Sequence, residues 1–254
     1  MNRSIQFLVQ RLPLLAGIMG AMVAFAITGP ALADTIKVDL ADNLGLTDHV
    51  VQIVALITVL SLAPSIFIMV TSFVRIVVVL SLLRTAIGTQ QTPPNSVIIS
   101  LALFLTAFVM TPTFTKAYND GIEPLMNQQI ELNEAFALSM DPFKTFMLTQ
   151  VRKEDLRLFV DLSNTAEPEE ANDLPLQVVV PSFMLSELRR AFEIGFLVFL
   201  PFIVIDMVVA SVLMSMGMMM LPPVTISLPF KLIFFVLVDG WTLIAGSLVQ
   251  SFGT

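Results

Sequence analysis

Residues 50–83 read VVQIVALITVLSLAPSIFIMVTSFVRIVVVLSLL, and Arg75 is the only charged residue among them. As one straight helix, these 34 residues would span about 51 Å at a rise of roughly 1.5 Å per residue. The hydrocarbon core of a bilayer is about 30 Å thick, so the stretch is longer than one membrane span requires. Pro64 lacks a backbone N–H and its ring clashes with the preceding turn, which predicts a kink or break at that position.

The composition of the whole chain is that of a membrane protein. Hydrophobic residues make up 56% of the 254 positions and charged residues 13%, against roughly 45–50% and about 25% in a soluble domain. The mean hydropathy is +0.87. A soluble protein of this size cannot cover so much apolar surface, so membrane lipid or protein partners must cover it. We therefore expect an all-α integral membrane protein built from helical hairpins.

Composition also excludes several classes of function. A net charge of −7 with no basic stripe argues against nucleic-acid binding. With no cysteine and one histidine, the chain lacks the ligands of zinc, haem and iron–sulfur sites and cannot form a disulfide. A Ser-His-Asp triad would depend on His49 alone, and no G-x-S-x-G motif supports one. We expect no catalytic residue, metal or cofactor.

The N-terminus has the features of a secretory signal peptide. Arg3 and Arg11 precede an uncharged, mostly apolar stretch, and Ala31-Leu32-Ala33 comes directly before Asp34. Small residues at −3 and −1 match a signal peptidase site, which predicts cleavage between Ala33 and Asp34. The alternative is a first transmembrane helix that stays attached. The prediction gives a signal peptide over residues 1–33 and a short segment over residues 34–49.

The rest of the chain divides into a first apolar hairpin, a charged aqueous segment and a second apolar hairpin, over residues 50–115, 116–181 and 182–254. In the first hairpin, Thr92 is placed to cap a new helix with Pro93 in its first turn. That helix runs as far as Pro112, where the next proline occurs.

The charged segment holds most of the chain's ionisable residues. Between residues 116 and 193 there are 7 basic and 14 acidic side chains. Asp141 followed by Pro142 predicts a helix start there. Four apolar residues then recur at helical spacing on one face, which we interpret as ordinary packing: Phe143, Phe146, Met147 and Val151. The acidic, proline-containing residues 165–175 predict a surface loop.

In the second hairpin, Ser182 is placed to cap a helix that begins at Phe183. This helix should end near Leu221, because a residue before proline avoids the helical conformation. A second helix then fits from Leu228 to Phe252. Four charged residues near the start of the first helix have i,i+3 and i,i+4 spacings that let them neutralise one another: Glu187, Arg189, Arg190 and Glu193.

The turn of this hairpin is rich in methionine. Residues 214–220 read MSMGMMM, with five methionines in seven positions. Methionine is unbranched and flexible, so it adapts to irregular surfaces. Gly217 loosens the backbone, whereas Pro222 and Pro223 stiffen the chain that follows. The turn could form a soft seal that lines a pore, or its methionines could fill gaps between helices; copper binding has no supporting cysteine or histidine.

Three charges interrupt the second hairpin: Asp206, Lys231 and Asp239. Each would cost about 2.5–3.5 kcal/mol at the centre of a helix in lipid, so each should pair or face water. Lys231 and Asp239 lie about 12 Å apart along a helix and cannot pair directly. We expect Lys231 to pair near Glu187. A proton relay or an aspartyl dyad of Asp206 and Asp239 is the alternative, although the motifs of intramembrane aspartyl proteases are absent.

Several short motifs occur in an order that resembles the FliP family of flagellar type III export gate proteins. They are TPPN at 92–95, PSFMLSEL at 181–188, AFEIGF at 191–196, LPF at 200–202, ID at 205–206, MGMMM at 216–220, PP at 222–223, ISLPFK at 226–231 and DGW at 239–241. The resemblance spans nearly all of the chain after the predicted signal peptide.

The resemblance implies a ring of five copies, joined by FliR and FliQ with FlhB nearby, in the bacterial inner membrane at the flagellar basal body. Much of the ring would face the periplasm and would surround a channel for unfolded flagellar proteins. It also implies that Met218, Met219 and Met220 form a gasket, with Gly217 as its hinge and Met216, Pro222 and Pro223 beside it. Virulence injectisomes have an equivalent subunit, which generally lacks a cleaved leader.

In a ring of identical acidic subunits, neighbouring copies would carry charge of the same sign. Like-charged surfaces repel unless other groups supply counter-charge. We therefore predict that Arg152, Lys153 and Arg157 pair with acidic residues of a neighbouring copy.

Overall fold

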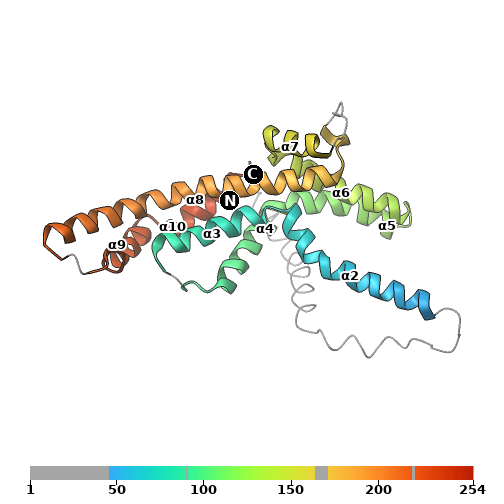
Figure 1. Cartoon of the computed structure of the whole chain (residues 1–254). Coiled ribbons are helices and arrows are strands. Elements are labelled where there is room, and N and C mark those ends of the chain that lie inside the picture. Colours follow the sequence, from blue (N-terminus) through green and yellow to red (C-terminus); the bar gives the residue numbers. More distant parts are fainter. Residues whose placement is uncertain (1–45, 90, 164–170, 219–220, 254) are drawn as a thin grey trace, which may run out of the picture. The chain divides into compact units, whose positions relative to one another are not determined.

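The computed structural model describes residues 46–253, except 90, 164–170 and 219–220 (Figure 1). All regular elements of the described part are helices, which confirms the all-α fold. The predicted cleavage site at Ala33 lies outside the described residues. The chain forms two compact units, residues 1–59 and 60–254, and the helices from α3 onward belong to the second.

The first apolar stretch forms two helices, α2 at Leu46–Val70 and α3 at Phe73–Ile87. Of the kink or break predicted at Pro64, the break is wrong, because α2 continues through this proline and ends at Val70, before Thr71 and Ser72. The Thr71 hydroxyl donates to the carbonyl of Phe67 at 2.9 Å and accepts from the N–H of Phe73 at 3.5 Å. Such side-chain bonds offer the backbone an alternative to the helical ladder, which places the break here.

The next helix, α4, occupies Asn95–Ala117 and continues through a π-helical turn, η2 at Tyr118–Ile122, into the short α5 at Glu123–Met126. The predicted start at Thr92 and Pro93 is wrong, since Pro94 is the N-cap. Pro93 itself precedes a proline, and such a residue is pushed out of the helical region. The helix also passes through Pro112 rather than ending there.

The charged segment forms α6 at Leu132–Gln150, α7 at Lys153–Ser163 and a short 3-10 turn, η3 at Ala171–Asp173. The helix start predicted at Asp141 and Pro142 is wrong, because α6 begins at Leu132 and contains both residues. Packing on each side of the proline holds the helix together: Ala135 and Met147 are both buried. Met147 lies in a core cluster with Phe143, Phe146 and Val151 against it, which confirms the predicted packing face.

The longest helix is α8, at Leu176–Ser215, and α3 packs along it (Figure 1). The N-cap predicted at Ser182 is wrong, because the helix already begins after Pro175. The Ser182 hydroxyl instead donates to the Val178 carbonyl at 2.6 Å inside the helix. The end predicted near Leu221 is also wrong, since α8 stops at Ser215.

The final segment forms two helices instead of the single predicted helix from Leu228 to Phe252. They are α9 at Pro223–Leu237 and α10 at Gly240–Gln250, with a bend of 63° between them. The interruption is at Asp239, whose φ of +50° lies in the left-handed region that a right-handed helix cannot contain. Pro223 occupies the first turn of α9, where its missing N–H has no helical partner to lose.

Three described helical segments are long and apolar enough to cross a membrane, and the bent α9–α10 pair would make a fourth. They lie within α2, within α4 to α5, and over α8. Many of their apolar side chains are exposed in the isolated chain, among them Phe104, Phe196 and Val236. These segments establish an integral membrane protein whose apolar surfaces need lipid or protein cover.

Candidate functional site: the methionine turn and its buried charge pairs

The methionine turn begins with a glycine stop. Gly217 has a φ of +76° and follows the C-cap Met216. The N–H of Met218 donates to the Leu213 carbonyl at 3.0 Å, and the N–H of Gly217 donates to the Met214 carbonyl at 3.0 Å. These two bonds form a Schellman motif, in which glycine takes the left-handed position and satisfies the last helical carbonyls. The motif explains why α8 ends well before the prolines.

The described methionines of the turn project away from the rest of the chain. The exposed fraction is 58% for Met214, 66% for Met216 and 43% for Met218. A Cβ added to Gly217 would meet no atom within 4 Å. Met219 and Met220 lie outside the described residues. A cluster of exposed, flexible apolar side chains at one turn can adapt to another surface, and gap filling within the single chain does not account for it.

A charge pair holds α8 to α9 below this turn. Lys231 Nζ lies 2.6 Å from Asp206 Oδ2 and also donates to the Ala86 carbonyl at 3.2 Å. Ser227 donates a hydroxyl hydrogen bond to Asp206 Oδ1. The Lys231 side chain is only 5% exposed, and that of Asp206 is 31% exposed. The pair therefore joins α8, α9 and the end of α3 at the base of the hairpin that carries the methionines.

This arrangement corrects the expected partner of Lys231. The structure pairs it with Asp206 across the hairpin, whereas Glu187 binds a different cation. Asp239 is exposed at the elbow between α9 and α10, and no described residue forms an ion pair or hydrogen bond with its carboxylate. It is therefore not part of a buried pair among the residues that the structure describes. The two aspartates therefore differ: Asp206 is paired with Lys231, whereas the side chain of Asp239 is exposed.

The partner of Glu187 is Arg75, a residue that sequence reasoning did not assign. Both side chains are fully buried, and Arg75 Nε donates to Glu187 Oε2 at 2.9 Å while a second bond joins the Arg75 guanidinium to Oε1. A single charged residue in a long apolar stretch is expected to have a buried partner or to face water, and Arg75 is such a residue. Its partner could not be inferred, because 112 residues separate them.

The predicted local neutralisation near the start of α8 is correct only in part. Arg189 lies 3.8 Å from Glu193, at the expected i,i+4 spacing, and 4.0 Å from Asp155. Arg190 instead donates to Gln150 on α6 at 3.2 Å. The side chains of Arg189 and Glu193 are 53% and 62% exposed, so they are surface pairs and not buried ones.

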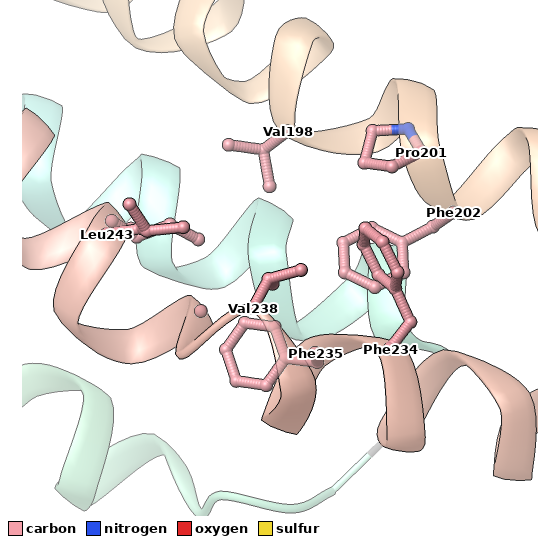
Figure 2. A pocket seen from close by; sticks show the side chains of 9 residues that line it. Val198, Pro201, Phe202, Phe234, Phe235, Val238 and Leu243 are labelled. Atoms are coloured by element: carbon pink, nitrogen blue, oxygen red, sulfur yellow. The ribbon is translucent and has the colours of Figure 1, made fainter.

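An apolar cavity of about 260 Å³ lies between α8 and the elbow of α9 and α10 (Figure 2). Figure 2 shows side chains from all three helices pointing toward it, including Val198, Phe202, Phe235 and Leu243. Its lining offers no polar contact, so it can hold hydrocarbon but cannot orient a polar ligand. In the described part of the chain, no group of three histidine, aspartate or glutamate side chains is placed to hold a metal ion.

Comparison with known proteins identifies close relatives. A sequence model of the FliP family matches residues 56–248. The flagellar biosynthetic protein FliP of Caulobacter vibrioides is 64% identical over 236 residues, covering 92% of this chain and 89% of that protein. The protein of the same name from Bacillus subtilis is 55% identical, covering 80% and 91% respectively. The one from Borreliella burgdorferi is 48% identical over 79% and 80%.

Proposed function

Because this chain belongs to the FliP family of flagellar export apparatus components, we propose that it forms the channel of the export gate and that its methionine turn seals that channel. The chain is a structural component of a membrane-embedded apparatus and not an enzyme. The channel would conduct unfolded flagellar proteins across the bacterial inner membrane.

The exposed methionine turn is the observation that carries this proposal. Its methionines protrude from a Schellman stop, and the Asp206–Lys231 pair fixes the two helices beneath them. A pore constriction must exclude ions by dewetting and must also let polypeptides of varied sequence pass. Flexible apolar side chains carried by two helices that a charge pair holds together meet both requirements. Met219 and Met220 extend the same turn in the sequence.

The proposed assembly is a ring of five copies that includes FliR and FliQ, with FlhB adjacent and much of the ring facing the periplasm. The exposed apolar faces of α4, α8 and α9 support burial against lipid or other subunits. The relatives compared above are flagellar proteins by name, which favours the flagellar apparatus over a virulence injectisome.

The test is membrane conductance of vesicles that contain the assembled gate. Replacing Met218, Met219 and Met220 by alanine should let small ions leak while the ring still forms. Met126→Ala is the matched control, because Met126 is 70% exposed but lies on α5, away from the turn in the sequence. An intact ring with unchanged conductance would show that the methionines do not seal the pore.

The main alternative is a proton channel or secondary transporter that uses Asp206 and Asp239. The engagement of Asp206 by Lys231 and Ser227 supports a structural role for this carboxylate instead. Replacing both aspartates by asparagine separates the two ideas. A transporter would remain assembled and lose flux, whereas we expect the gate to lose assembly.

A further inference from the structure

The end of the chain closes a buried cage around Arg75. This residue is 0% exposed on α3, and α8 supplies the carboxylate of Glu187. Gln150 on α6 accepts from Arg75 Nη2 at 3.2 Å. The remaining nitrogen, Nη1, donates to the backbone carbonyl of Ser251 at 3.1 Å and to its hydroxyl at 3.0 Å. Of the described residues, only Ser251 therefore accepts from Nη1.

Phe252 covers the face of the same guanidinium. The Arg75 guanidinium carbon lies 3.7 Å from the centre of the Phe252 ring, which is cation–π geometry. The ring also stacks on Phe146 with centres 6.2 Å apart, and Gln150 Nε2 donates to the Phe252 carbonyl at 3.4 Å. Without Ser251 and Phe252, one side of a buried cation would have no partner, and burying an unpaired polar group is costly.

The segment that supplies these groups is attached through an elbow. Asp239 holds the left-handed conformation between α9 and α10, and the two helices bend by 63°. In α10 and the residues after it, the buried apolar side chains are Leu248 and Phe252, which pack in a core cluster with residues of α3, α4 and α8. By contrast, α3 packs along α8, and the Arg75–Glu187 pair joins those two helices without help from the chain end.

We propose that residues 240–253 form a strap that docks last, onto a preformed core of α3 and α8, and that docking on Arg75 completes the subunit before it enters the ring. The first part concerns the single chain. The second part rests on the ring proposed above. Ser251 follows Arg75 by 176 residues in the sequence, so Arg75 acquires its full set of partners only after the strap has folded back onto α3.

The absence of cysteine makes docking measurable, since single introduced cysteines report access to a maleimide. Leu248→Cys, at a site 1% exposed on the strap, should react slowly in the full chain in detergent. Gln250→Cys is the matched control at an exposed site on the same helix and should react fast in every background. Val179→Cys, at a site 0% exposed on α8, reports a core cluster that contains no strap residue.

Weakening the strap should open it selectively. In the background S251A with F252L, we expect the labelling rate of Leu248→Cys to rise by roughly tenfold or more while that of Val179→Cys stays low, as for local unfolding of one segment. A second background, R75M with E187M, removes both buried charges and leaves none unpaired. We expect the same selective rise there, because the strap has lost its site.

Three results would contradict the proposal that residues 240–253 form a separately docking strap. One is fast labelling of Leu248→Cys in the otherwise unchanged chain. Another is no rise in either weakened background. The third is a parallel rise at Val179→Cys, since residues 240–253 would then belong to one cooperative core.

Sedimentation in mild detergent tests the second part. Both weakened backgrounds should lose the ring, and a normal yield of ring with an open strap would refute the role in assembly. If the unaltered chain forms no ring, the proposed function fails, whereas labelling still decides whether the strap exists.

Discussion

At the scale of single residues, the Asp206–Lys231 pair is asymmetric in its burial. The Lys231 side chain is 5% exposed and the Asp206 side chain 31% exposed, so water can reach the carboxylate far more easily than the ammonium group. Losing one partner leaves the other charge behind, and the cost depends on how well that charge is hydrated. The two single substitutions should therefore differ.

Asp206→Asn should be the more harmful change, lowering the free energy of unfolding by about 3–5 kcal/mol because it leaves a buried ammonium group unpaired. Lys231→Met should cost about 1–3 kcal/mol, since Asp206 keeps Ser227 and access to water. Thermal unfolding of the detergent-solubilised chain measures both. Equal losses, or a larger loss for Lys231→Met, would contradict this ranking.

Gly240 is a second residue whose identity the packing dictates. A Cβ at this position would lie 2.1 Å from the ring of Phe235, whereas a Cβ at Gly246 on the same helix would meet nothing within 4 Å. We expect Gly240→Ala to destabilise the protein by about 1–3 kcal/mol through overpacking. Gly246→Ala should be neutral or stabilising by about 0.5–1 kcal/mol, since alanine favours a helix interior. Thermal unfolding of the two variants side by side provides the comparison, and a loss at Gly246 as large as that at Gly240 would count against it.

At the scale of elements, α8 and α9 end beside left-handed residues, whereas the prolines that the structure describes lie at or just before helix starts or inside helices. Six predicted boundaries relied on proline or on a capping side chain, and the helices pass through those points or begin or end away from them. Prolines 64, 112 and 142 all lie inside helices, because packing or a membrane environment compensates the lost hydrogen bond. The left-handed residues Gly217 and Asp239 mark actual ends.

The Schellman stop at Gly217 leads to a prediction for the α8 end. Gly217→Ala places a side chain at a φ of +76° without any clash, so the cost should be the left-handed penalty alone, about 1–2 kcal/mol. Gly217→Asn should cost less, because asparagine tolerates this conformation. The free energy of unfolding and gate conductance should be measured together. A harmless Gly217→Ala would mean that the turn does not require its left-handed residue.

At the scale of the whole molecule, the isolated chain leaves charges whose partners must be sought elsewhere. Arg152 already lies 3.5 Å from Glu154 and 3.8 Å from Glu193 in its own chain. Lys153 and Arg157 are exposed on α7, and no described residue forms an ion pair with either of them. The prediction of pairing with a neighbouring copy therefore rests best on these two residues.

Reversing Lys153 and Arg157 to glutamate should lower the yield of assembled ring, because it adds negative charge to an already acidic subunit. The loss should shrink at high salt, which screens exposed charges. Native electrophoresis in mild detergent measures ring yield. Arg84→Glu would not be a fair control, since Arg84 binds Asn95 at 2.6 Å within its own chain. Normal assembly of the reversed variant at low salt would disprove the pairing.

Much of the molecule could be inferred from the sequence, for identifiable reasons. Hydrophobic content is a matter of composition, which does not depend on three-dimensional arrangement, so the helical membrane class could be predicted. The packing face of α6 is local, because i,i+3 and i,i+4 residues always meet on one side of a helix. The methionine turn could be recognised because its methionines lie close together in the sequence, within residues 214–220.

The sequence by itself determined which side chains are charged within apolar helices, and only the tertiary structure decided which of them pair. Arg75 meets Glu187 across 112 residues, and Lys231 meets Asp206 across 25. These partners depend on the register of helices that pack against one another, and helical periodicity relates only residues on one helix. For the same reason, the contact of Ser251 and Phe252 with Arg75 has no local signal, because it exists only after α10 has folded back.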